Sequence, residues 1–455
     1  MPSCRLPRTV LLATLLIPTV ARGQAPPAEW QPWLDSLAHA PRAERIEQDV
    51  RTLVGFGTRH TASDTVSTTR GIGAARRWIH AEFERISSAC GGCLEVRYVR
   101  SLVRGTPNGR LREDTEIVSV IAIQWGTMRP REWVIMSGDI DSRVSDVRNA
   151  VEDSPGANDN ASGMAGTLEA ARVLSQRRFP GTIVYAGLAG EEQGLYGGEA
   201  LAAQIVDSGW TVRGVLNNDM IGNIAGINGV VDSREFRIFS EATAVGLDAA
   251  ALRAQRIYGG EVDGPSRQLA RYVAMLTQRY LPELEPKLIY RLDRFGRGGH
   301  HRPFNDAGMP GVRIMEAHEH YDRQHQDLRT EDGREYGDVL AHVDFAYAAR
   351  LTAVNVLALA GIAAAPPPPE TVRLAGAVSA DTRVSWTAVA DPGLAGYRIH
   401  WRDTTAPQWT WSRFVPAGSD RATLAGIIID DYLFGVSSVG VDGSESVVRF
   451  PGFTR

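Results

Sequence analysis

The sequence has little net charge and few cysteines. Its 455 residues include 49 lysines and arginines against 53 aspartates and glutamates, which gives a formal net charge of −4. Proteins that bind nucleic acid usually carry a strong positive excess, so we expect no nucleic-acid partner. No internal repeat is visible in the sequence. The length predicts two or more domains rather than one small core.

The chain also lacks a clean hydrophobic run that would anchor it in a membrane. Residues 1–23 have a positively charged start, an apolar stretch at 10–20 and small residues at the end, which is typical of a cleaved signal peptide. That stretch is too short to span a bilayer. The later apolar segment 336–363 is interrupted by Arg350 and Asn355, so we expect a buried helix and no transmembrane span. These features predict a secreted or periplasmic protein.

The three cysteines are too few for a thiolate metal site. Cys4 precedes the apolar stretch and would be removed with the signal peptide. Cys90 and Cys93 remain, separated by two glycines. In an oxidising compartment, the leading expectation is a tight disulfide between them, and a redox or metal-binding pair is the alternative.

Apolar strands alternate with amphipathic helices through most of the chain. The apolar run 182–188 is typical of a buried strand, and 161–177 has the apolar spacing of a helix. This alternation predicts a layered α/β sheet. Further predicted strands are 117–123, 133–136, 212–216 and 311–315.

Several carboxylates fall just beyond these strands, where the loops of an open α/β sheet form the ligand crevice. Gathered at one edge, they would repel one another and raise their pKa values, and a bound cation resolves that conflict. His325, in a late loop after a strand, can add a nitrogen ligand, so zinc or a harder divalent ion suits the set. The carboxylates are Asp139, Asp141, Asp159, Glu191, Glu192 and Asp219.

Glu191 and Glu192 are adjacent in this set. Neighbouring side chains on an extended chain face opposite ways, so both can serve one site only if the backbone turns sharply. The flanking Gly190 and Gly194 permit such a turn. The alternative for the pair is a solvated surface turn.

Four motifs in order resemble peptidase family M28, which contains zinc aminopeptidases and carboxypeptidases. They are Pro-Gly-Ala-Asn-Asp-Asn-Ala-Ser-Gly at 155–163, Gly-Glu-Glu-Gln-Gly at 190–194, Asn-Asp-Met at 218–220, and His325. The resemblance covers roughly residues 40 to 360 and is specific, because the motifs recur on the expected elements. It implies a mixed, mostly parallel sheet with helices on both faces, and hydrolysis of a peptide bond by metal-activated water.

The resemblance also implies a role for each matching residue. Asp159 would bridge two zinc ions, Glu192 and His325 would complete the first site, Asp219 would belong to the second, and Glu191 would be the general base. His325 is preferred over the nearby His318 and His320, because the run 321–327 is similar to the ligand loop of the family.

One departure from the family concerns Asp139 and His300. The first motif of the family is His-x-Asp, and this chain has Asp139-Ile140-Asp141. Asp141, which would orient that histidine in the family, faces a like charge here and could support or replace a ligand. Relatives generally carry Asp at the position of His300. One hypothesis is that His300 ligates the second metal or pairs with Asp139; the other is two independent changes after loss of that metal. Asp139, Asp159 and Asp219 would offer only oxygen, which suits Mn²⁺, Mg²⁺ or Ca²⁺.

A run of prolines at 366–369 marks the clearest domain boundary. We expect a metallopeptidase-like domain at 24–364, a linker at 365–370 and a small all-β sandwich at 371–455. The last part resembles a fibronectin type III module, with Trp386 and Tyr397 at the positions of its core aromatics. Such a tail is expected to bind a surface polymer or another protein.

The leading interpretation is an exported exopeptidase acting on peptides, most simply an aminopeptidase. A second hypothesis is a single-zinc enzyme similar to glutaminyl cyclases, with Asp159, Glu192 and His325 as ligands and Glu191 as a proton shuttle. A third is a catalytically silent peptide-binding relative. Retention of Glu191 beside three ligands argues against silence, because an inactive site needs no base.

Overall fold

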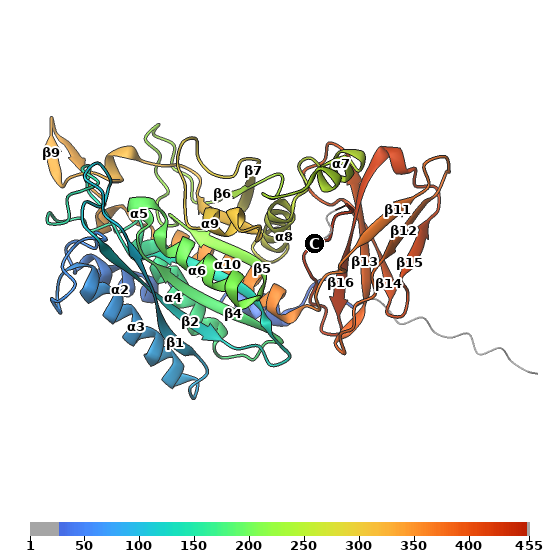
Figure 1. Cartoon of the computed structure of the whole chain (residues 1–455), viewed down its shortest axis with the longest axis horizontal. Coiled ribbons are helices and arrows are strands. Elements are labelled where there is room, and N and C mark those ends of the chain that lie inside the picture. The colour runs from blue at the N-terminus through green and yellow to red at the C-terminus, as the bar shows by residue number, and fades with distance from the viewer. Residues whose placement is uncertain (1–26, 453–455) are drawn as a thin grey trace, which may run out of the picture.

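The computed structural model describes residues 27–452 (Figure 1). The predicted signal peptide, residues 1–23, lies outside the described residues. The chain begins with three helices, α1 (Pro32–Ala38), α2 (Ala43–Val54) and α3 (Gly71–Ala89). Cys90 and Cys93 form a disulfide directly after α3, as predicted.

A mixed sheet forms the centre of the larger structural unit. Its strands are β1 (Glu95–Val103), β2 (Thr115–Gln124), β3 (Arg129–Asp139), β4 (Gly181–Leu188), β5 (Thr211–Asn218), β6 (Glu235–Ser240), β7 (Glu285–Ile289) and β8 (Gly311–Glu316). Their order across the sheet is β1-β2-β4-β3-β5-β8-β6-β7. β3 is parallel to β4 and β5, β5 to β8 and β6 to β7, and the other neighbours are antiparallel. The α/β fold with a mixed sheet is confirmed.

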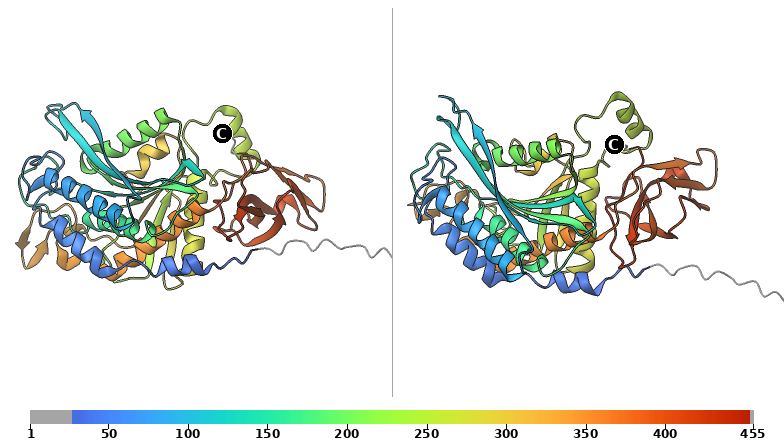
Figure 2. Two further views of the ribbon diagram at one scale, coloured as in Figure 1. Left: turned by 90° about the horizontal axis from the view of Figure 1, so that it is seen from below. Right: turned by 60° about the horizontal axis from the view of Figure 1, so that its bottom comes forward.

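Helices cover both faces of this sheet (Figure 2). In β3, Val134 and Met136 pack into one apolar cluster, whereas Trp133 and Ile135 pack into another, because successive residues of a strand face opposite ways. The first cluster includes α2, α3, α4 (Ala161–Leu174), α8 (Pro265–Tyr280) and α10 (Phe345–Ala364); the second includes α6 (Tyr196–Ser208) and α9 (His301–Asp306). Burial on both faces explains the near-continuous apolar runs in the sequence.

α10 is the apolar helix that raised the question of a membrane span. Among the described residues it alone is long and apolar enough to cross a bilayer, yet 83% of its most apolar window is buried inside the protein. Asn355 is accommodated because its Nδ2 donates to Asn218 Oδ1 over 2.7 Å, and Asn218 Nδ2 donates back over 3.0 Å. α10 is therefore the buried core helix that the sequence predicts, and it fixes the end of β5.

The tail after α10 is all β. One sheet contains β11 (Val372–Ala375), β12 (Thr382–Trp386) and β15 (Arg421–Leu424), and the other contains β13 (Leu394–Asp403), β14 (Trp411–Pro416) and β16 (Tyr432–Gly440). Trp386 and Tyr397 are buried together, with ring centroids 5.1 Å apart. The all-β tail is confirmed, and its kinship with fibronectin type III modules stays a prediction. Pro366 and Pro369 in the predicted linker are buried.

The tail contacts the larger unit through buried ion pairs. Asp263, just before α8, lies 2.8 Å from Arg402 of β13 and 2.6 Å from Arg271 of α8. Arg129 of β3 pairs with Asp391 of the tail at 2.5 Å. Figure 1 shows the tail against the end of the sheet where α7 (Ala249–Ile257) and α8 lie.

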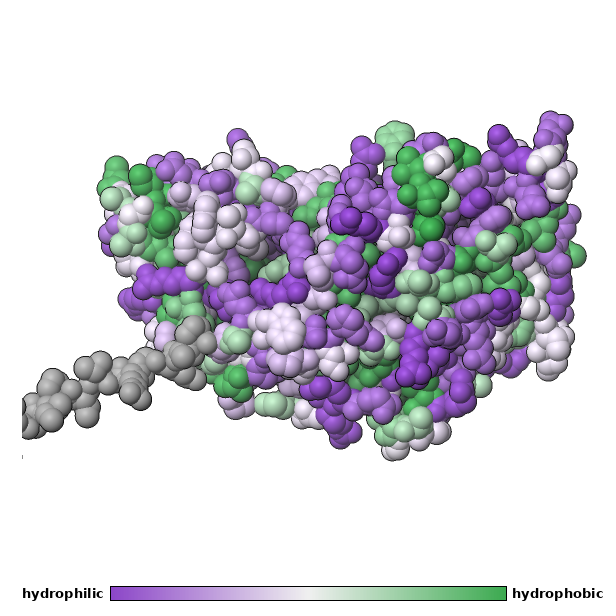
Figure 3. All heavy atoms as spheres, turned by 180° about the vertical axis from the view of Figure 1, so that it is seen from behind, coloured by the Kyte–Doolittle hydropathy of each residue, from purple (hydrophilic) through white to green (hydrophobic). Residues whose placement is uncertain are grey.

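Short elements complete the described chain. They are α5 (Glu191–Gly194), η1 (Tyr321–Arg323), β9 (Arg329–Glu331), β10 (Arg334–Tyr336), η2 (Leu340–His342) and η3 (Ile429–Asp431). Polar and apolar side chains are interspersed over the face seen from behind (Figure 3). This is the surface of an ordinary globular protein, as the composition indicates.

Candidate metal centre

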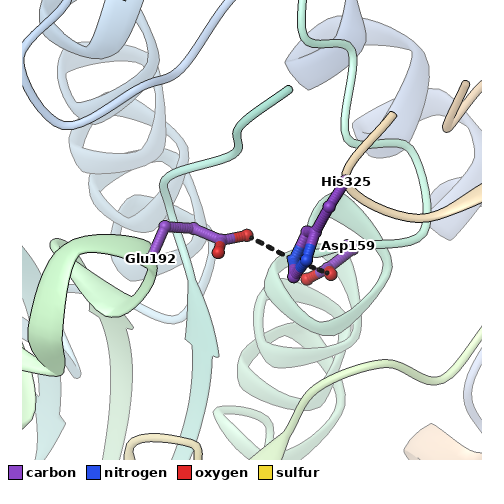
Figure 4. Close-up of side chains that lie close together, drawn as sticks. All are labelled: Asp159, Glu192 and His325. Atoms are coloured by element: carbon purple, nitrogen blue, oxygen red, sulfur yellow. Dashed lines mark ion pairs between the residues drawn. The ribbon is translucent and has the colours of Figure 1, made fainter. Parts of the chain in front are cut away.

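Three side chains from separate segments of the chain converge in space (Figure 4). Asp159 precedes α4, Glu192 lies in α5, and His325 follows η1. His325 Nε2 is 2.8 Å from Asp159 Oδ2 and 3.0 Å from Glu192 Oε1. The three ligand atoms lie within 4.8 Å of one another, so they could hold one metal ion. Of the three histidines considered in that segment, only His325 joins this cluster.

The charges of the cluster are strongly coupled. Burial alone would raise the pKa of Asp159, but His325 and nearby arginines outweigh it and hold that pKa well below its usual range. Burial would lower the pKa of His325, whereas Glu192 and Asp159 raise it to about 9. The carboxylates therefore favour a positive charge at this position, which is the property a cation site requires.

Arg143 is a member of the site that sequence reasoning missed. Its Nε lies 2.8 Å from Glu192 Oε2, and its Nη2 lies 2.6 Å from His325 Nδ1. The only signal in the sequence is its place two residues after Asp141. Arg110 also reaches the site, because its Nη1 donates to the carbonyl oxygen of Glu192 over 2.6 Å.

The turn that carries the two glutamates is built around Asp141. Gly190 has φ +78°, which starts α5, and the flanking glycines make the sharp turn that was predicted. Asp141 Oδ1 accepts from the backbone N–H of Glu191 over 3.2 Å, and its Oδ2 accepts from that of Glu192 over 3.0 Å. Asp141 thus holds the turn that carries Glu192, and whether it also supports or replaces a ligand at the first motif stays a prediction.

Glu191 faces a cavity next to the cluster. The cavity has a volume of about 870 Å³, and its walls include Asp159, Glu192, Asp219 and His325. Burial, together with Glu192, Asp219 and other carboxylates, raises the pKa of Glu191 well above its usual range. A carboxylate of raised pKa beside a cation site is suited to taking up a proton.

Two nitrogen-bearing side chains, His300 and Asn160, contact the carboxyl group of Asp139. Its Oδ1 lies 2.5 Å from His300 Nδ1, and its Oδ2 accepts from Asn160 Nδ2 over 2.7 Å. Burial raises the pKa of Asp139 to about 8 and lowers that of His300 to about 4. The pairing of Asp139 with His300 is the contact that one of the two hypotheses on this departure expects.

Asp219 is paired with an arginine that the sequence reasoning also missed. Arg313 of β8 is fully buried, and its Nη2 lies 2.7 Å from Asp219 Oδ2. The same guanidinium lies 3.2 Å from Asp293 and donates to the carbonyl oxygen of Gly298 over 2.6 Å. Asp139 ends β3 and Asp219 directly follows the neighbouring β5, but they do not join the group of Asp159, Glu192 and His325.

The donor set of that group fits zinc. Two carboxylate oxygens and one imidazole nitrogen are ligands that zinc prefers, and three protein ligands leave a coordination position open, as in catalytic zinc sites. The oxygen-only set expected at the second position is not assembled in the same way, because Asp139 and Asp219 face protein partners.

Comparison with known proteins shows the family of the chain. The model of peptidase family M28 matches residues 119–344. A probable zinc metalloprotease of Leptosphaeria maculans is 40% identical over 432 residues, which cover 94% of this chain and 98% of that protein. Another, from Pyricularia oryzae, is 40% identical over 442 residues, 95% of this chain and 86% of that protein.

Solved structures show the same fold at low identity. The LapA aminopeptidase of Legionella pneumophila aligns with a TM-score of 0.51 at 17% identity, covering 72% of this chain and 73% of that one. LapB of the same organism aligns with a TM-score of 0.52 at 17% identity, covering 72% and 74%. At this identity the likeness concerns the fold alone. The family match and the two metalloprotease relatives together show that the chain belongs to peptidase family M28, the zinc metallopeptidases.

Proposed function

We propose that this metallopeptidase is an exported exopeptidase, most simply an aminopeptidase, that uses Glu191 as its general base. The observation that carries the proposal is the convergence of Asp159, Glu192 and His325 beside Glu191 on one wall of a cavity. Preference for an amino terminus is supported only by the likeness of fold to the LapA aminopeptidase.

In this proposal each residue has one task. Asp159, Glu192 and His325 hold zinc, and bound zinc polarises the scissile carbonyl and makes water more acidic. Glu191 takes a proton from the attacking water and gives it to the leaving amine. Asp141 keeps Glu191 and Glu192 in register through their backbone N–H groups.

The expectation of two divalent ions stays a prediction. Because Asp139 pairs with His300 and Asp219 with Arg313, the proposed reaction uses a single ion. Elemental analysis of protein purified without chelators tests the number. One zinc per chain supports a single site; a second ion, such as Mn²⁺ or Mg²⁺, would mean that Asp139 and Asp219 turn towards it.

A substrate panel tests the reaction. Peptides with a free amino terminus, the same peptides with an acetylated amino terminus, and peptides that begin with glutamine are incubated with the zinc-loaded protein. We expect release of the first residue only from peptides with a free amino terminus. Release of the last residue from acetylated peptides would indicate a carboxypeptidase. Loss of ammonia without cleavage would indicate a cyclase, and no reaction would indicate a binding protein.

Export and the role of the tail belong to the same proposal. The pattern of residues 1–23 supports a cleaved signal peptide, and a disulfide such as Cys90–Cys93 is typical of oxidising compartments. Mass spectrometry of the mature protein from the medium or periplasm should place its first residue near Gln24. We also propose that the tail binds a surface polymer or protein, which pull-down on isolated cell walls can test.

A further inference from the structure

A buried contact joins two residues far apart in the chain. Asp139 ends β3, and His300 directly precedes α9. His300 Nδ1 lies 2.5 Å from Asp139 Oδ1, and the two side chains are 0% and 3% exposed, respectively. Water therefore cannot replace either partner, and each side chain depends on the other for this hydrogen bond.

The imidazole of His300 makes no other hydrogen bond within the described residues. Its Nε2 is buried and has no partner there. Gly198 of α6 leaves space for the ring, because a Cβ at that position would lie 2.8 Å from His300 Cδ2. The ring is thus enclosed by packing and directed at Asp139 by one polar contact.

The other oxygen of Asp139 ties it to the candidate metal centre. Asn160 Nδ2 donates to Asp139 Oδ2 over 2.7 Å and also to the carbonyl oxygen of Asn218 over 2.7 Å. Asn160 directly follows Asp159, and Asn218 directly precedes Asp219. Asp139 is therefore held between His300 on one side and the segments that carry two further carboxylates on the other.

We propose that His300 is a positioning residue: it holds Asp139, and Asp139 in turn holds Asn160, the residue next to the ligand Asp159, so that His300 and Asp139 act as one unit. The inference rests on the proposed function, in which Asp159, Glu192 and His325 bind zinc. Asp139 Oδ1 faces His300 Nδ1, and its Oδ2 faces Asn160 Nδ2, so a nitrogen at each oxygen fixes the orientation of this buried side chain. Side chains that position metal ligands through hydrogen bonds typically contribute about 10- to 100-fold to metal affinity or activity.

The pairing predicts that the two residues can be exchanged. The contact needs one imidazole and one carboxylate, and Asp139→His combined with His300→Asp keeps both. Asp139→His alone places two imidazoles together, and His300→Asp alone places two buried carboxylates together, which repel each other. The double variant should therefore be closer to the wild type than either single variant.

The experiment measures zinc dissociation constants, by competition with a chelator, for the wild type, both single variants and the double variant of the full chain. We expect each single variant to lose about tenfold or more in zinc affinity, and the double variant to recover most of it. His300→Asn, whose amide nitrogen can take the place of Nδ1, should stay near the wild type, whereas His300→Leu should not. Values of kcat and KM are measured in parallel.

Two results overturn the proposal: losses that add in the double variant, or a folded His300→Leu variant with unchanged zinc affinity. If His300→Leu does not fold, the comparison of Asp139→His and His300→Asp with the double variant still tests the proposal. Failure of the proposed function gives a different pattern. If the wild type binds zinc and the double variant recovers zinc affinity, but the wild type cleaves no peptide, the pairing is supported and the peptidase activity is not.

Discussion

At the scale of single residues, two arginines balance the carboxylates of the site. Arg313 lies between Asp219 and Asp293, and Arg143 lies between Glu192 and His325. Buried carboxylates without a partner are costly, and a guanidinium keeps its charge at any pH at which the protein is folded. The arginines therefore let the cluster fold before any metal binds.

Arg313 gives the first prediction. Replacing it by methionine leaves Asp219 buried without its paired cation and removes one partner of Asp293, which still lies 3.3 Å from Arg294, so the free energy of unfolding should fall by about 3 to 5 kcal/mol. Urea denaturation at neutral pH measures the change. Arg297→Met is the matched control, because Arg297 is 31% exposed and shares Glu319 with two other arginines. Equal losses in the two variants would contradict the special role of Arg313.

At the scale of elements, the ends of the strands were readable from the sequence. Asp159, Glu192 and His325 each follow a strand or precede a helix, and a motif marks each of them, so the cluster of three could be predicted. Arg143 and Arg313 could not, because their partners are distant in the chain and an arginine in a strand or loop has no distinctive pattern. Arg313 lies in β8, which reads as an ordinary buried strand.

The turn that carries Glu191 and Glu192 also has contacts that the sequence did not predict. Its glycines predicted a sharp bend, and Gly190 indeed has φ +78°. The sequence placed Asp141 beside Asp139, because the two are close in the chain. In the structure they face different partners: Asp139 contacts His300 and Asn160, whereas Asp141 accepts the N–H groups of α5. Residues two apart in a strand share a face, but β3 ends at Asp139, so Asp141 lies outside the strand and can face other partners.

The tail gives the second prediction, which concerns pH. Burial alone would raise the pKa of Glu445, but His400, Arg398 and Ser437 outweigh it and lower that pKa to about 2. A lowered pKa means that this carboxylate stabilises the fold above its unfolded pKa of about 4.5, and the contribution is lost as pH falls towards 2. The shift corresponds to about 3 kcal/mol.

Glu445→Gln tests this contribution. The variant should be less stable than the wild type at pH 7, and the difference should shrink as pH falls below 4, measured by urea denaturation of the full chain. Asp430→Asn, at an exposed position of the tail, serves as the control and should show no such convergence. A constant difference between Glu445→Gln and the wild type at all pH values would contradict the assignment.

At the scale of the whole molecule, buried ion pairs join the tail to the larger unit. Asp263 is 0% exposed and accepts from both Arg271 of α8 and Arg402 of β13. The prolines of the predicted linker are partly buried rather than extended into solvent. The predicted division at residues 365–370 stays a prediction. The sequence does not indicate this joint, since its three members lie in segments with no shared motif.

The joint gives the third prediction. Asp263→Ala leaves two buried arginines without a carboxylate, so the free energy of unfolding should fall by about 3 to 5 kcal/mol. Limited proteolysis should then cleave near residues 365–370 and separate the tail. Asp420→Ala, at the exposed end of the tail, is the control. If Asp263→Ala resists proteolysis as well as Asp420→Ala does, packing without this ion pair is enough to hold the units together.

The measurement that tests the central claim most directly compares zinc content and peptide hydrolysis in Glu191→Gln. We predict zinc content equal to the wild type, because Asp159, Glu192 and His325 are intact. Hydrolysis should fall by about 10²- to 10⁴-fold, because the general base is lost. Glu192→Gln, which removes a ligand, should instead lose zinc. Loss of zinc from Glu191→Gln, or hydrolysis at the wild-type rate, would contradict the account.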